Sequence, residues 1–170
     1  MAEMIGWPEF ERARPDLASA GRDLLYQFGV GLAFLGTVDA SGAPRVHPVC
    51  PILCEPGLFV LLIVSPKRTD LRRDGRFALH SFPREDDEDA FYVAGTARPE
   101  EDPGIERHVR AAFVAERPGM DLPDFDSQEV FALDLERCLL TRTTGHGDPD
   151  PRHTVWRSTD SGYLPPRTGS

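Results

Sequence analysis

The feature that most constrains the fold is a series of short strand-like segments separated by links of hairpin length. Turn-forming sequences, Asp-Ala-Ser-Gly at residues 39–42 and Glu-Pro-Gly at residues 55–57, separate the first three segments. This pattern predicts a mostly β fold with helices appended at the joins (α+β), in which six strands form an antiparallel barrel or roll. Apolar or alternating stretches fall at residues 32–38, 44–53, 58–64, 76–81, 91–98 and 129–142.

Three prolines interrupt the second of these segments. Pro44, Pro48 and Pro51 lack the backbone N–H that a sheet ladder requires. We therefore expect this strand to lie at a sheet edge or to carry a bulge. The third segment, residues 58–64, is continuously apolar, which is typical of a buried strand.

Helical periodicity occurs on both sides of the strand series. We expect one domain over residues 16–142, preceded by a loose lead-in over residues 1–15 and followed by a nonperiodic tail over residues 143–170 that packs on the barrel or on its cleft. The first predicted helix, residues 16–28, has its apolar face formed by Leu17, Ala20, Leu24, Leu25 and Phe28. The second begins at Asp102 and Pro103, and its apolar stripe is formed by Ile105, Val109, Ala112 and Phe113.

Charge and hydropathy exclude several classes of protein. The formal net charge is −9 and the pI is near 5.0, which argues against nucleic acid as a partner. The longest apolar stretch, residues 57–64, is too short to span a bilayer. The first residues lack the layout of a secretory signal peptide, so we expect a cytoplasmic protein.

The cysteines indicate neither a disulfide framework nor a metal site. There are three, Cys50, Cys54 and Cys138, and an odd number favours buried thiols. His47 precedes two of them, but the spacing matches no common zinc pattern. On one strand, His47 would also point away from Cys50 and Cys54. We expect no metal at these residues.

Lysine is almost absent from this chain, and its one occurrence is at a predicted helix start. Of 19 basic side chains, only Lys67 is a lysine. Ser65 suits an N-cap and Pro66 suits the first helical position. Free backbone N–H groups, the helix dipole, Lys67 and Arg68 would then face one point, as in a phosphate site. The alternative is a single lysine on a solvated turn.

The order of three segments resembles the pyridoxamine-5′-phosphate-oxidase-like family, the split-barrel flavin and deazaflavin oxidoreductases. The first is residues 35–49, which match the family's first hairpin. The second is Ser-Pro-Lys at residues 65–67 with the following Leu71 and Arg-Arg-Asp at residues 72–74. The third is residues 91–97, a strand that ends in a Gly-x-Ala step. The resemblance covers roughly residues 16–142.

The resemblance implies a homodimeric split barrel, a Greek-key roll, that binds FMN or a deazaflavin in a cleft at the dimer interface. The flavin would carry out hydride or electron transfer on a small conjugated or aromatic molecule, so no catalytic acid or base is expected. Related proteins also place a C-terminal tryptophan near the cofactor. The residues implied for the cofactor are Arg45, Val46, His47, Pro48, Ser65, Lys67, Arg68 and Trp156.

Several departures from the family's pattern separate this chain from the true oxidase. His47 stands where the oxidase has an arginine, Ile52 where it has a lysine, and Pro66 where it has a second arginine. Ala90 replaces an amide side chain, and the tail lacks the family's Arg-x-His substrate motif. We therefore expect a divergent member rather than a pyridoxamine phosphate oxidase.

Alternatives stay open at this point. A split barrel that stores or senses a flavin, a deazaflavin or haem without fast turnover also fits the pattern, and a cofactor-free structural dimer is the third class. His47 is equally suited to contact a cofactor and to be a half-buried strand histidine. Trp156 is either a residue that stacks on the cofactor or an anchor that holds the tail on the barrel.

Overall fold

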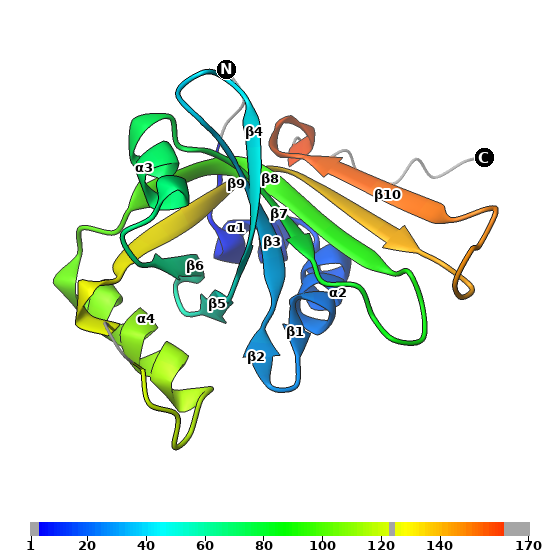
Figure 1. The fold of residues 1–170 in the computed structure, drawn as a ribbon. Coiled ribbons are helices and arrows are strands. Elements are labelled where there is room, and N and C mark those ends of the chain that lie inside the picture. The colour runs from blue at the N-terminus through cyan, green and yellow to red at the C-terminus, as the bar shows by residue number, and fades with distance from the viewer. Residues whose placement is uncertain (1–3, 123–124, 162–170) are drawn as a thin grey trace.

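A computed structural model of the chain describes residues 4–122 and 125–161. These residues form a curled antiparallel sheet of eight strands with helices at its ends and on one side, as Figure 1 shows. The helices are α1 (Trp7–Ala13), α2 (Pro15–Leu25), α3 (Pro66–Arg73) and α4 (Pro103–Ala115), with short 3-10 turns η1 (Phe125–Ser127) and η2 (Ser158–Ser161). The strands are β1 (Tyr26–Gln27), β2 (Val30–Gly31), β3 (Ala33–Val38), β4 (Pro44–Val49), β5 (Pro51–Cys54), β6 (Gly57–Leu62), β7 (Arg76–Ser81), β8 (Ala90–Pro99), β9 (Glu129–Arg142) and β10 (Arg152–Arg157).

The strand order of the main sheet explains its curl. The order is β4-β3-β7-β8-β9-β6-β5, with β10 added to β9. The two ends of this order, β4 and β5, are consecutive in the chain and only Cys50 separates them. The sheet must therefore bend round on itself, as in a split barrel. The antiparallel, mostly β prediction is confirmed, although the sheet has more strands than the six expected.

Two of the extra strands have identifiable causes. The segment predicted as one strand over residues 44–53 breaks at Cys50 into β4 and β5, between Pro48 and Pro51. Both pieces are sheet edges, so the prediction that prolines place this segment at an edge is confirmed. The long β9 accommodates another strand, because its first part pairs with β6 and its last part, Arg137 to Arg142, pairs with β10.

The N-terminal segment differs from the loose lead-in expected over residues 1–15. Residues 7–13 form α1, and Trp7 and Phe10 are buried. Ile5 forms a β-bridge with Leu135 of β9. The first domain boundary therefore does not separate a loose arm from the barrel, because α1 contributes to the same core.

The predicted helix over residues 16–28 is shorter than expected. It runs as α2 from Pro15 to Leu25, and the chain then turns through the β1–β2 hairpin. Phe28, expected on the apolar face, lies at the tip of that hairpin with a positive φ of 56° and is 93% exposed. The glycines at 29 and 31 end the helical pattern, as expected, but they do so by supporting a hairpin.

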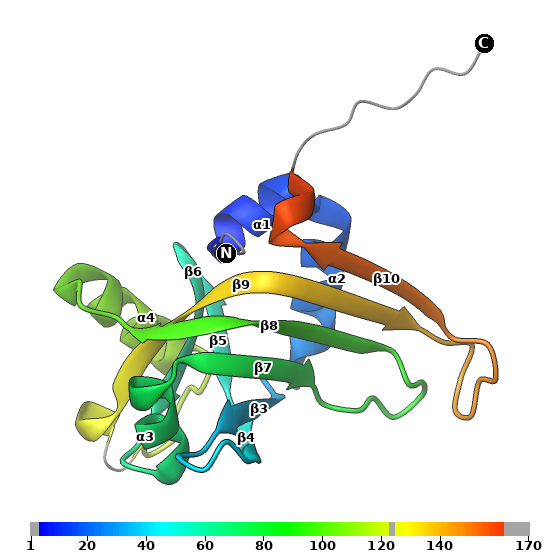
Figure 2. The same cartoon turned by 90° about the horizontal axis from the view of Figure 1, so that it is seen from above.

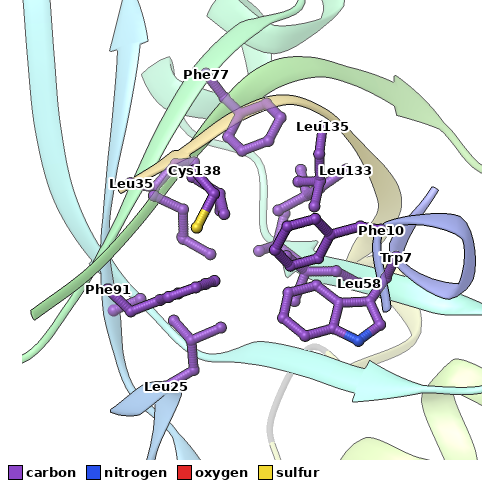
Figure 3. Close-up of a cluster of buried hydrophobic side chains, with 14 of the residues drawn as sticks. Trp7, Phe10, Leu25, Leu35, Leu58, Phe77, Phe91, Leu133, Leu135 and Cys138 are labelled. Atoms are coloured by element: carbon purple, nitrogen blue, oxygen red, sulfur yellow. The ribbon is translucent and has the colours of Figure 1, made fainter. Parts of the chain in front are cut away.

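The core lies between the helices α1 and α2 and the inner face of the sheet. Figure 3 shows the rings of Trp7, Phe10 and Phe91 meeting leucines from the sheet. The ring centroids of Trp7 and Phe10 are 5.3 Å apart. Gly21 of α2 lets the rings of Phe91 and Trp7 approach the helix, because a Cβ there would be 2.6 Å from Phe91 and 2.9 Å from Trp7. Each such buried side chain contributes roughly 1.5–3 kcal/mol.

The tail is more regular than its composition indicates. Residues 152–157 form β10, which pairs with β9 along its whole length. In Figure 2 this strand lies beside β9, while α3 and α4 lie at the opposite end of the sheet from the β9–β10 loop. Among the helices of the described residues, none is both long and apolar enough to cross a membrane.

Candidate functional site

The predicted helix start at Ser65 is present, and the first N–H groups of the helix have no partner within it. Ser65 has the extended N-cap conformation and Pro66 occupies the first turn of α3. The Ser65 hydroxyl does not cap the helix, because it donates to the carbonyl of Ile63 at 3.0 Å. The first helical bond runs from Thr69 N–H to Ser65 at 3.1 Å. The N–H groups of Lys67 and of the next residue precede that bond.

A buried carboxylate, Asp70, collects the polar groups beside α3. Its oxygens accept hydrogen bonds from Thr37 Oγ1 at 2.9 Å, from Arg45 Nε at 3.0 Å and from Arg73 at 3.2 Å. Burial alone would raise the pKa of this carboxyl, but the bonds from Thr37, Arg45 and Arg73 hold the pKa below its usual value. Arg45 is therefore an ion-pair partner of α3, and it also lies 3.9 Å from Asp39.

A second carboxylate, Glu129 at the start of β9, holds two more arginines. Arg68 Nε donates to it at 2.6 Å, and Arg72 donates through two nitrogens, the shorter bond being 2.7 Å. Burial opposes ionisation of Glu129, but Arg72 and Arg68 lower its pKa overall. The structure thus directs Arg68, expected at the phosphate, towards a carboxylate 61 residues away.

Lys67 differs from the arginines around it. Within residues 4–122 and 125–161 its side chain makes no hydrogen bond and no ion pair. Burial, and then the nearby charges of Lys67 and Arg45, lower the pKa of His47 of β4. The Nε2 atom of His47 is buried, and no group of the described chain hydrogen-bonds to it. Lys67 and His47 define what we term the Lys67 corner.

The other two β4 residues expected at the cofactor, Val46 and Pro48, point to the opposite face of the sheet. Both are exposed, Val46 by 66%. Val46 pairs with Gly36 of β3, and Gly36 pairs with Ala78 of β7. Directly paired residues share a face, so small side chains lie together there. We term this the outer face of the sheet.

A hollow of about 370 Å³ lies on this outer face. Arg45 reaches both the hollow and the Lys67 corner, since it lines the first and lowers the pKa of His47 in the second. The small side chains at Gly36 and Ala78 leave the floor of the hollow open. The residues that line it are Gly36, Thr37, Val38, Pro44, Arg45, Val46, Arg76, Phe77, Ala78, Tyr92 and Arg137.

Trp156 is separate from these residues. It is 3% exposed, and its ring lies 4.8 Å from that of Phe10 in the core. This is the position of an anchor that holds β10 on the barrel. We therefore correct the cofactor role expected for Trp156, because an indole packed among core side chains has no free face for a ligand.

Sequence reasoning missed the residues whose role depends on strand pairing. Gly36, Ala78, Tyr92 and Arg137 come from four strands and meet only because β3, β7, β8 and β9 are neighbours. No local sequence pattern predicts this arrangement. The one available signal was the alternation on β7, which places Ala78 on the same side as the exposed His80.

His80 has a fixed tautomer on the outer face. Its Nδ1 lies 2.7 Å from the backbone carbonyl of Ser81, which can only accept, so Nδ1 carries the proton. The Nε2 lone pair is then available, and the side chain is exposed. His80 pairs with Phe34 on one side and Tyr92 on the other.

Solved structures of low sequence identity share this fold. A haem-binding protein from Mycobacterium smegmatis matches with a TM-score of 0.62 at 18% identity, over 87% of this chain and 60% of that one. The haem storage protein HutZ from Vibrio cholerae matches with 0.52 at 20% identity, over 78% and 92%. A Listeria innocua protein provisionally named a pyridoxamine 5′-phosphate oxidase matches with 0.55 at 19% identity, over 76% and 98%.

These matches establish the fold of the chain. At such identities the likeness extends to the fold and not to a family or to a particular ligand. No family model and no curated protein matches the sequence.

Proposed function

We propose that this protein binds FMN and acts as a flavin-dependent oxidoreductase on a small conjugated or aromatic molecule. The observation that carries the proposal is the Lys67 corner. Arg45 and Arg73 form ion pairs with Asp70, and Arg68 and Arg72 form ion pairs with Glu129. Lys67 is the cation near α3 without such a partner in the described chain. A ligand phosphate would supply the missing negative charge.

The groups at the corner fit a phosphate. An ammonium group donates up to three hydrogen bonds, and the N–H groups at the start of α3 add donors together with the positive end of the helix dipole. The orphaned Nε2 of His47 gives a further reason to place a polar ligand there, because buried polar atoms rarely lack a partner. Arg68 and Ser65 contribute through their backbone position rather than their side chains.

The hollow on the outer face fits the flavin ring. It has about 370 Å³ of volume, and Gly36, Val46 and Ala78 give it an apolar floor. Arg45 reaches both the hollow and the corner, so one ligand with a ring and a phosphate would contact both. Bound flavin supplies hydride or electron transfer, and the chain's own residues hold and orient it.

A second copy of the chain would complete this site. Val46 is 66% exposed and Val155 is 57% exposed on the outer face, where a partner would cover them. We therefore include a homodimer in the proposal, with the flavin between the two outer faces. Sedimentation equilibrium tests it: wild type should be a dimer, and Val46→Glu should dissociate it and weaken FMN binding together. A monomeric wild type that binds FMN with full affinity would contradict the dimeric site.

Titration with FMN and with riboflavin tests the phosphate site. We expect flavin fluorescence to be quenched at one FMN per chain, and riboflavin, which lacks the phosphate, to bind at least roughly tenfold more weakly, the effect of a charged hydrogen bond. A deazaflavin that carries phosphate should compete with FMN at the same site, and relative affinity then decides between the two cofactors. Absence of binding by all three would overturn the proposal.

His80 favours haem as a second candidate. A histidine whose Nδ1 donates to a backbone carbonyl presents Nε2 to a metal, which is the usual arrangement of an iron ligand. Haem binding is also named for two of the proteins that share the fold. If haem is the ligand, wild type titrated with haem should develop a shifted Soret band. His80→Ala should lack this band, and added imidazole should restore it. The control His153→Ala, another exposed histidine, should keep the band; equal bands in all three proteins would exclude His80.

A further inference from the structure

A second, smaller hollow lies on the outer face beside the first. Its volume is about 210 Å³, and Tyr92, Arg137, Leu139 and Val155 line it together with Cys138. Tyr92 pairs with Leu139, and Leu139 pairs with Val155, so the three side chains form one row across β8, β9 and β10. Paired residues project from the same face of a sheet, so this row is an apolar strip with an aromatic ring at one end.

Arg137 is the polar group at this strip. Its side chain is exposed, and in the described part of the chain it makes neither a hydrogen bond nor an ion pair. The guanidinium carbon lies 5.8 Å from the centroid of the Tyr92 ring. Arg142, on the same strand, instead bonds to Asp89 at 2.7 Å. The guanidinium group of Arg137 lies beside the hollow without a counter-ion among the described residues and is therefore available to a ligand.

The strand register adds a second positive charge. Arg157 of β10 is the direct cross-strand partner of Arg137, so two arginines start from facing positions on the same sheet face. Like charges directly opposite each other destabilise a strand pair. In a chain whose net charge is −9, this is a local concentration of basic side chains, but Arg157 has an interaction of its own, so the charge left to a ligand is that of Arg137.

We infer that this hollow binds a small aromatic carboxylate. The guanidinium of Arg137 would pair with the carboxylate in a two-point arrangement, which its planar fork favours. The ring would lie against Tyr92, Leu139 and Val155, where an aromatic group gains both apolar burial and ring contact. An inorganic anion alone would use the charge and leave the apolar strip unfilled.

The position of the hollow gives this ligand a role. Tyr92 and Arg137 line both hollows, so a molecule in the smaller hollow would lie next to one in the larger. In that sense the inference deepens the proposed function: the carboxylate would be the substrate, and this role rests on the flavin occupying the larger hollow. Binding of the carboxylate stands on its own.

Titration of the ¹⁵N-labelled full chain with benzoate, followed by NMR, tests the site. We expect shift changes centred on Tyr92, Leu139 and Val155. Affinity should fall at least tenfold in Arg137→Gln, and less in Arg137→Lys. Arg152→Gln, which removes another exposed arginine from β10, is the matched control and should bind benzoate like wild type. Benzamide, the uncharged analogue, should bind wild type as weakly as benzoate binds Arg137→Gln.

Three results would overturn the inference. The first is equal benzoate affinity in wild type and Arg137→Gln. The second is the absence of shift changes at Tyr92, Leu139 and Val155. The third is that inorganic phosphate shifts the signals of these residues as much as benzoate does. Lys67→Ala separates this site from the flavin site, because it should keep benzoate affinity while losing FMN affinity. Binding of benzoate without binding of FMN would support the carboxylate site and contradict the flavin site. Binding of FMN without binding of benzoate would support the flavin site and contradict the carboxylate site.

Discussion

The arginines packed against α3 and the lysine in its first turn differ in what neutralises them. Arg73 and Arg45 bond to Asp70, whose side chain is 5% exposed, and Arg72 bonds to Glu129. Lys67 lies instead beside a half-buried histidine whose Nε2 has no partner in the described chain. Both regions are close to one helix, so local sequence does not explain the difference.

Positive charge has two different uses around α3. Asp70 of α3 bonds to Thr37 of β3 and to Arg45 of β4. Glu129 of β9 bonds to two arginines of α3, so these charges hold the helix on the sheet and their role is structural. At the Lys67 corner the buried Nε2 of His47 has no partner in the described chain, which costs stability and is useful only if a ligand fills the site. We term Asp70 and Glu129 with their arginines the paired region. Mutations in the paired region should therefore change the stability of the protein, and mutations at the Lys67 corner should change ligand binding.

The largest effect is expected at Asp70. Asp70→Asn should lower the free energy of unfolding by about 3 kcal/mol, since it leaves Arg45 and Arg73 without their shared buried counter-ion. Urea unfolding at neutral pH measures this. Asp74→Asn, which breaks the exposed pair with Arg76, is the control and should change stability little. If Asp70→Asn lowered the free energy of unfolding no more than Asp74→Asn does, the paired region would have no structural role.

A smaller loss of stability is expected at Glu129. Glu129→Gln weakens the bonds from Arg68 and Arg72 and should cost roughly 1–2 kcal/mol, because those arginines remain partly hydrated. The same variant also tests the phosphate site, since it frees Arg68 near the start of α3. Riboflavin affinity should stay the same, and FMN affinity should not fall. A loss of FMN affinity would mean that Glu129, and not Lys67, organises the phosphate site.

Acid should act on the paired region in a defined pH range. Asp70 and Glu129 have folded-state pKa values below their usual 3.8 and 4.5, so on acidification the unfolded chain takes up protons first. Their contribution is complete above about pH 5 and is lost as the pH falls through the lowered folded-state values. Unfolding free energies measured from pH 6 to pH 3 should fall less steeply in Asp70→Asn. An equal slope in both proteins would show that Asp70 is not held ionised.

The smallest effect concerns His47 and needs no ligand. Burial and the charges of Lys67 and Arg45 lower the pKa of His47 below 6.5. Lys67→Ala removes one of these charges, so the pKa of His47 should rise. An NMR pH titration of its ring protons gives the value, with Arg152→Ala as a distant control. An unchanged pKa in Lys67→Ala would place Lys67 too far from His47 for the two to share a phosphate.

The sequence predicted the strands and the helix start better than it predicted the partners of each charge. Pro44, Pro48 and Pro51 marked an edge strand, and Ser65 and Pro66 marked the start of α3, because backbone constraints act locally. The pairing of Arg68 with Glu129 spans 61 residues and exists only after β6 and β9 are adjacent.

Burial was similarly hard to infer where it depends on the whole fold. Trp7 and Phe10 lie in a short helix without a repeating apolar pattern, and contacts with α2, with Phe91 and with Trp156 bury them. Phe28 matched the helical spacing but falls after the hairpin turn begins. The hollows were beyond prediction because their walls come from strands that are distant in the chain.

The proposed function depends on recognition of a phosphate by Lys67. The direct measurement is a cycle of four dissociation constants: FMN and riboflavin, each with wild type and with Lys67→Ala. We predict that Lys67→Ala weakens FMN by roughly 1.5–3 kcal/mol, about ten- to a hundredfold, and leaves riboflavin unchanged, so the gap between the two ligands closes. A gap of the same size in both proteins would contradict the account.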